Sequence, residues 1–145
     1  MIFNELDEII QQEIVDLLNK HIVSSAEIIK KDKMLLPMLM INGKTLESNK
    51  LISLQSMDKT IDVDKAYEKA LSIIKKESFN YALFSYSTRM GTSSGQVINA
   101  IKTTIITETG VSVTFISMYE LKGLIRKNMN ILETVLYDMR ENVLV

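Results

Sequence analysis

The chain has 145 residues, with 17 basic and 18 acidic side chains and no cysteine. This length suits a single domain, residues 1–145, that buries a core without disulfides or metals. The near-zero net charge argues against a nucleic-acid binder, which needs a basic face. Absent cysteines exclude thiol catalysis and thiolate metal sites, and they favour the cytoplasm. The longest apolar run, residues 34–41, is too short to cross a bilayer, so no membrane role is expected.

The first predicted element is a long amphipathic helix over residues 3–31. Its apolar residues lie three or four apart and therefore form one stripe along a helix. The stripe consists of Phe3, Leu6, Ile10, Ile14, Leu17 and His21.

A β-hairpin is expected next. Residues 34–41 read as a buried strand, in which Pro37 indicates an edge position or a bulge because proline has no amide proton. Asn42 and Gly43 tolerate positive φ and predict a tight turn. The return strand is expected within residues 44–57.

A second helix is predicted over residues 62–77, with Thr60 or Asp62 as its N-cap. Aromatic and β-branched residues then become frequent, which favours strands. The three expected strands cover residues 81–90, 97–107 and 111–118.

The last segment, residues 119–140, is predicted to be a third helix because its apolar residues alternate three and four apart. The element order is then α-β-β-α-β-β-β-α. Short turns make the sheet largely antiparallel, so the fold class is α+β with about five strands flanked by helices.

The heptad-like stripe of the last predicted helix suggests a subunit interface. One polar residue within such a stripe specifies register and partner number at a cost in stability. The alternative is that both long helices cover only the sheet of their own chain. The candidate interface residues are Leu121, Ile125, Asn128, Leu132, Val135 and Met139.

The densest polar cluster lies around residues 85–95 and is a candidate site for an anion or another small molecule. Arg89 offers a fork of donors, and glycine-rich residues 91–95 offer backbone amides. Residues 91–95 match the Gly-x-Ser-x-Gly pattern of hydrolase elbows, but the only histidine precedes this serine in the chain. An ordinary hairpin loop is the competing interpretation. The candidate ligand-binding residues are Ser85, Ser87, Arg89, Ser93, Ser94 and His21.

The chain carries no complete catalytic or metal-binding signature. His21 is a candidate base only if a nucleophile lies near it in the fold, and a packed histidine is the alternative. No histidine pair or calcium-loop pattern is present, so we expect no metal and no cofactor. The sequence therefore favours a non-catalytic domain that acts as a homodimer or by binding a protein partner. A small-molecule site or small enzyme around Arg89 is the second hypothesis.

Overall fold

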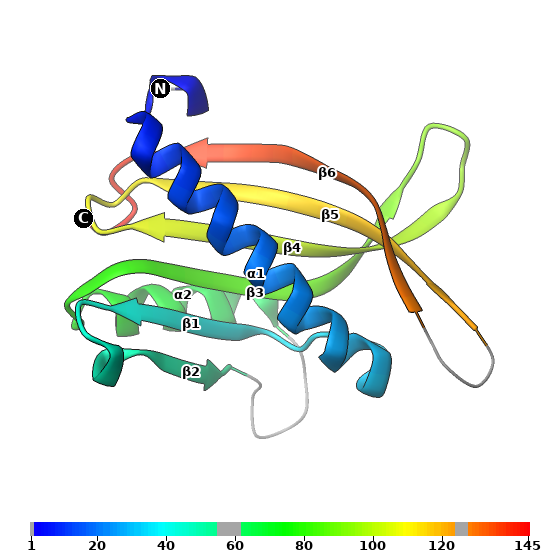
Figure 1. Ribbon diagram of the computed structural model, residues 1–145, viewed down its shortest axis with the longest axis horizontal. Helices are drawn as coiled ribbons and strands as arrows, with labels where there is room; N and C mark the ends of the chain where they lie inside the picture. The colour runs from blue at the N-terminus through cyan, green and yellow to red at the C-terminus, as the bar shows by residue number, and fades with distance from the viewer. Residues whose placement is uncertain (1, 55–61, 124–127) are drawn as a thin grey trace.

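A computed structural model describes residues 2–54, 62–123 and 128–145 of the chain. It contains a six-stranded antiparallel sheet with strand order β2-β1-β3-β4-β5-β6. The predicted α+β class is therefore confirmed. One long helix crosses one face of this sheet and a shorter helix packs on the other (Figure 1). The elements are α1 (Glu8–Asp32), β1 (Met38–Gly43), β2 (Lys50–Ser53), α2 (Val63–Ile74), β3 (Phe79–Gly91), β4 (Val97–Thr107), β5 (Ser112–Lys122) and β6 (Asn128–Arg140).

Helix α1 is the predicted first helix, with a later start. The Asp7 side chain caps it by accepting a hydrogen bond from the Ile9 amide at 2.8 Å. Phe3–Glu5 forms a separate 3-10 turn before this cap. The helix ends at Lys33, which adopts a left-handed conformation with φ of 69°. Its buried stripe consists of Ile14, Leu18, His21, Ser25 and Ile29.

The first hairpin differs from the prediction at both of its marker residues. Pro37 directly precedes β1, and β1 pairs with both β2 and β3, so the proline does not mark an edge strand. Gly43 is not in a tight turn but ends β1. A Cβ atom there would lie 2.0 Å from the Ser48 Oγ atom and 2.7 Å from the Ser48 carbonyl oxygen. The glycine is required by this close approach rather than by a positive φ.

Helix α2 confirms the second predicted helix. Its N-cap is Asp62, whose side chain accepts a hydrogen bond from the Lys65 amide at 3.1 Å. The alternative cap, Thr60, lies outside the described residues. The helix buries Ala66, Ala70 and Ile74 against the sheet.

Strands β3, β4 and β5 confirm the three strands predicted in the second half of the chain, but the helix predicted over residues 119–140 is wrong. Strand β5 continues to Lys122, and a further strand, β6, occupies Asn128–Arg140. The sheet therefore has six strands rather than five, and the last element of the predicted order is a strand.

Two β-bulges disturb the strand period of β6. The pairing of β5 with β6 passes from Glu133 to Ile131 and from Asp138 to Leu136, so Leu132 and Tyr137 are extra residues in β6. Each extra residue lengthens the spacing between residues on the same face from two to three. Apolar spacing of three is the signal from which a helix is predicted.

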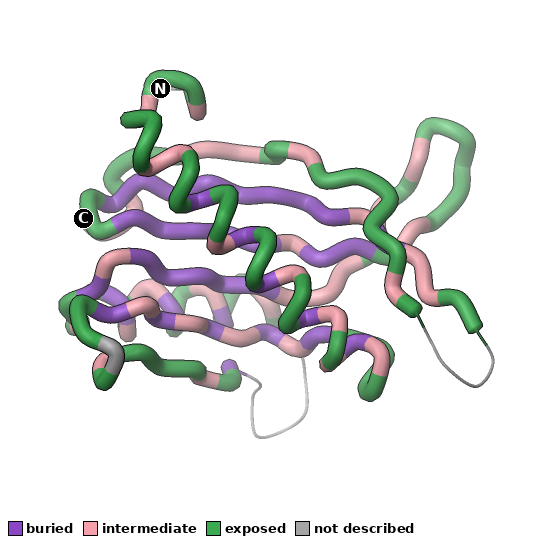
Figure 2. Tube along the Cα trace, in the orientation of Figure 1, coloured by how far each residue is buried: buried purple, intermediate pink, exposed green. Residues whose placement is uncertain are grey.

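The core lies on both faces of the sheet, and burial is concentrated in β3, β4 and β5 (Figure 2). One cluster packs α2 against Ala82, Phe84 and Ile106. The other packs α1 against Tyr81, Leu83 and Ile105. Among the described residues, no helix is long and apolar enough to span a membrane.

Candidate functional site

The predicted ligand-binding residues lie in three separate places. These are a buried cluster under the middle of α1, a cavity at the far end of α1, and the connection between β3 and β4. Strand alternation puts Ser85, Ser87 and Arg89 on the face that α1 covers. His21 reaches this face from the middle of α1 and contacts Ser85. Ser93 and Ser94 lie in the exposed connection between β3 and β4.

The structure brings together a buried histidine and two serines. The His21 Nε2 atom lies 2.6 Å from the Ser85 Oγ atom and 3.2 Å from the Ser25 Oγ atom. His21 is 3% exposed and Ser85 is fully buried. Within the described part of the chain, His21 Nδ1 and the nearby Thr103 Oγ1 are buried without a hydrogen-bond partner. Ser85 and Thr103 are register partners on β3 and β4, so these polar groups form one cluster beneath α1.

Burial determines what this cluster does chemically. It lowers the pKa of the His21 imidazole from 6.5 to about 4, because a charged ring would lose its hydration. The imidazole is therefore neutral near pH 7. A neutral histidine beside a serine resembles the base and nucleophile of a hydrolase, but neither residue lines a cavity described below. The geometry fits a packed histidine rather than a catalytic pair.

Arg89 lies at the far end of α1, beside a cavity of about 300 Å³. Lys33, Asn99 and Tyr119 line the same cavity, as does Ser87. The Ser87 Oγ atom accepts a hydrogen bond from the Leu35 amide at 2.6 Å, which holds the segment after α1 against β3.

The glycine-rich residues 91–95 form a hairpin connection between β3 and β4 (Figure 1). Thr92 organises it by contacting the Ser94 Oγ atom at 2.9 Å and accepting a hydrogen bond from the Gln96 amide at 3.1 Å. Gly95 has φ of 81°, which favours glycine. A strand follows this connection, whereas a hydrolase elbow needs a helix. The loop residues do not line the Arg89 cavity.

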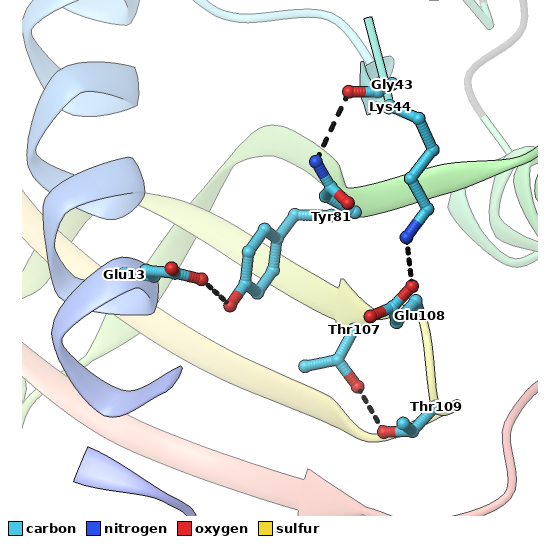
Figure 3. Close-up of polar contacts among 8 residues, drawn as sticks. Glu13, Gly43, Lys44, Tyr81, Thr107, Glu108 and Thr109 are labelled. Carbon is cyan, nitrogen blue, oxygen red and sulfur yellow. Dashed lines mark hydrogen bonds and ion pairs between the residues drawn. The ribbon is translucent and has the colours of Figure 1, made fainter. Parts of the chain in front are cut away.

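The largest described cavity, about 700 Å³, lies where the first half of α1 meets the ends of β1, β3 and β4. Figure 3 shows the polar contacts around it. The Tyr81 hydroxyl donates a hydrogen bond to Glu13 of α1. Burial of the hydroxyl raises the pKa of Tyr81, and the hydrogen bond to the Glu13 carboxylate raises it further. Lys44 forms an ion pair with Glu108.

The carboxylates that line this cavity are already engaged in structural contacts. Glu13 and Glu108 have the partners just described. Asp7 caps α1, and Asp16 accepts a hydrogen bond from Gln12 at 2.9 Å. These contacts account for the acidic residues as parts of the fold. No local pattern predicts this cavity, because its lining comes from segments far apart in the chain.

The five predicted interface residues that the structure describes lie on strands β5 and β6 rather than along one helix. Leu121 packs against the core beneath the end of α1, and Met139 against the α1 cluster. Val135 is half-buried and Asn128 is exposed at the start of β6. Leu132, a bulge residue, is 51% exposed. Ile125 lies outside the described residues.

Strand β6 is an edge of the sheet. It is 13 residues long, whereas the opposite edge, β2, has four. Four large apolar side chains of β6 are exposed: Ile131, Leu132, Leu136 and Tyr137.

No family model matches the chain, and comparison with curated proteins and with solved structures found no match. Within the described ranges, no group of histidine and acidic side chains is arranged to hold a metal ion.

Proposed function

We propose that this protein is a non-catalytic domain that acts by self-association or by binding another protein, with β6 as the contact. The observation that carries this proposal is the long edge strand with its four exposed apolar side chains. An edge strand presents unpaired backbone amides and carbonyls to which another strand can be added.

Charges and bulges are the devices that usually protect such edges. Strand β6 has no lysine, and its charged residues are Glu133, Asp138 and Arg140. The last two form an ion pair with each other at 2.8 Å. Leu132 and Tyr137 are bulge residues that interrupt the regular register of β6. A strand added to the free edge of β6 would therefore pair regularly only with the residues between and beside these two bulges. These features favour a specific contact centred on the apolar residues over unlimited sheet extension.

The test is the solution mass by light scattering over a concentration series, for the wild type and for Leu132→Asp and Leu136→Asp. Val97→Asp is the matched control, because Val97 is an exposed strand residue (67%) outside β6. We expect a concentration-dependent dimer that both β6 variants convert to a folded monomer and that the control leaves intact. A wild type that stays monomeric throughout contradicts self-association. An unaffected dimer in both β6 variants contradicts the choice of β6.

A second candidate function is anion binding at Arg89. The observation that favours it is that Arg89 and Lys33 line one cavity, with Asp32 as its carboxylate. Paired cations are typical of sites for phosphate or carboxylate groups. Thermal unfolding with added phosphate or citrate tests this idea. Arg89→Ala should abolish any stabilisation, whereas Ser93→Ala, outside the cavity, should retain it. Stabilisation that survives Arg89→Ala rules out this site.

A further inference from the structure

A third cavity, of about 270 Å³, lies on the face of the sheet opposite α1. Its lining comes from α2 and from strands β3 to β6. Helix α2 packs on the β1 and β3 side of this face, and its first turn borders the cavity. Side chains from five elements thus converge on one hollow that the sequence analysis did not single out.

The floor of this cavity carries hydroxyl groups. Thr104 and Thr114, on neighbouring strands, lie with their Oγ1 atoms 2.9 Å apart. Ser112 also lines the cavity and is only 4% exposed. Within the described part of the chain, its side chain forms no hydrogen bond. Among the described residues the Ser112 oxygen is not one of the fully buried unpaired atoms, so its hydroxyl borders the cavity and is available to solvent or to a ligand.

The walls of the cavity are aromatic. Phe84 lies between Tyr67 and Tyr86, with ring centroids 5.3 Å and 5.7 Å away. Tyr137 of β6 lines the cavity as well and is 57% exposed. The Lys102 ammonium lies 4.7 Å from the centroid of its ring. Aromatic faces of this kind stack on flat rings and add to the binding free energy beyond simple burial.

The charges around the cavity balance. Lys102 and Arg140 are cations, and Asp64 and Asp138 are anions. Arg140 donates to Asp138 through its Nε atom at 2.8 Å. Burial raises the pKa of Tyr67, which keeps its hydroxyl neutral and able to donate. Balanced charge with both donors and acceptors suits an uncharged polar ligand rather than a multiply charged ion.

We propose that this cavity binds a small ligand with a ring that packs face-on against an aromatic side chain and whose edge carries hydrogen-bond donors and acceptors. Nucleosides and monosaccharides both have this chemistry. The volume is at the small end for ligand sites, which limits the ligand to about one such unit. The ring stacks against Tyr137, and its edge reaches the hydroxyls of Ser112 and Thr114. This site shares Tyr137 with the surface proposed for association through β6, whereas Ser112 and Thr114 lie on β5, so Ser112→Ala tests the ligand site separately.

The test is a titration of the full chain followed by two-dimensional amide NMR. The probes are adenosine and uridine in one arm and methyl glucoside and methyl galactoside in the other. We expect saturable shifts at the amides of Thr104, Ser112 and Thr114 with one of the two arms, which then identifies the source. An absence of saturable shifts in both arms overturns the proposal.

Variants separate this site from general surface binding. Tyr137→Ala removes an exposed ring, so folding should be retained, and the affinity should fall by about ten-fold. Ser112→Ala removes the free hydroxyl and should weaken binding several-fold. Thr134→Val, on the opposite face, is the control and should bind like the wild type. Equal affinity of wild type and Tyr137→Ala overturns the assigned site.

Discussion

The buried imidazole of His21 predicts that the protein loses stability in mild acid. A folded-state pKa of about 4 against 6.5 for the unfolded chain means that the folded state binds the proton more weakly. The stabilisation is therefore complete above about pH 6.5 and is lost as the pH falls toward 4. A pKa difference of about 2.5, at about 1.4 kcal/mol per pKa unit, corresponds to about 3 kcal/mol.

The measurement is the free energy of unfolding in urea at several pH values between 7 and 4. The comparison is His21→Gln, which keeps a polar side chain toward Ser85 but has no titrating group. Carboxylates titrate in both proteins, so the difference between the two curves isolates the histidine. We expect the wild type to lose about 3 kcal/mol more than the variant over this range.

A direct check is available because the chain has a single histidine. Its ring-proton NMR signals can be followed through pH without an assignment problem. Parallel stability curves for the two proteins, or a folded-state pKa at or above 6.5, would refute the reasoning.

Two further predictions concern stability and are measured by urea unfolding. Thr103→Val removes a buried hydroxyl that has no hydrogen-bond partner among the described residues and should stabilise the protein by about 1 kcal/mol. Thr104→Val, at the neighbouring position on the other face of the sheet, breaks the contact with Thr114 and should destabilise the protein by about 1 kcal/mol. Equal changes in the free energy of unfolding for the two variants would contradict this account. Gly43→Ala forces a Cβ atom against Ser48 and should cost roughly 1–3 kcal/mol; an unchanged midpoint would show that the β1–β2 connection relaxes freely.

Local patterns predicted those elements whose periodicity is regular. Helices α1 and α2 have apolar residues at helical spacing, and the structure has both helices; of the two caps, only Asp62 of α2 was predicted, as an alternative to Thr60. Strands β3 to β5 were indicated by β-branched and aromatic composition. In β6 the two bulges disturb the strand period. A bulge forms only when a strand pairs with its neighbour, so the sequence of β6 alone does not predict it.

The candidate site was predicted only in part, for a related reason. The sequence singled out both His21 and Ser85, and the structure joins them across 64 residues of chain. The apolar stripe around His21 allowed a packed histidine, but the burial of Ser85 beside it depends on how α1 lies on the sheet. Ser25 and Thr103 escaped notice because an isolated hydroxyl has no distinctive local pattern. Ser93 and Ser94 were grouped with Arg89 because they are close in sequence. An extended strand separates successive residues widely, so residues close in sequence do not share one site here.

The order of the strands also bears on how the chain folds. Strands β3 to β6 form a meander in which each pairs with the next along the chain. Such local contacts form with a small loss of loop entropy, whereas pairing β1 with β3 requires closure over α2. Docking of α1 joins the first part of the chain to β4 and β5 and involves still longer separations. A chain caught before that docking exposes the apolar face of a preformed four-stranded meander, and aggregation competes with folding at this step.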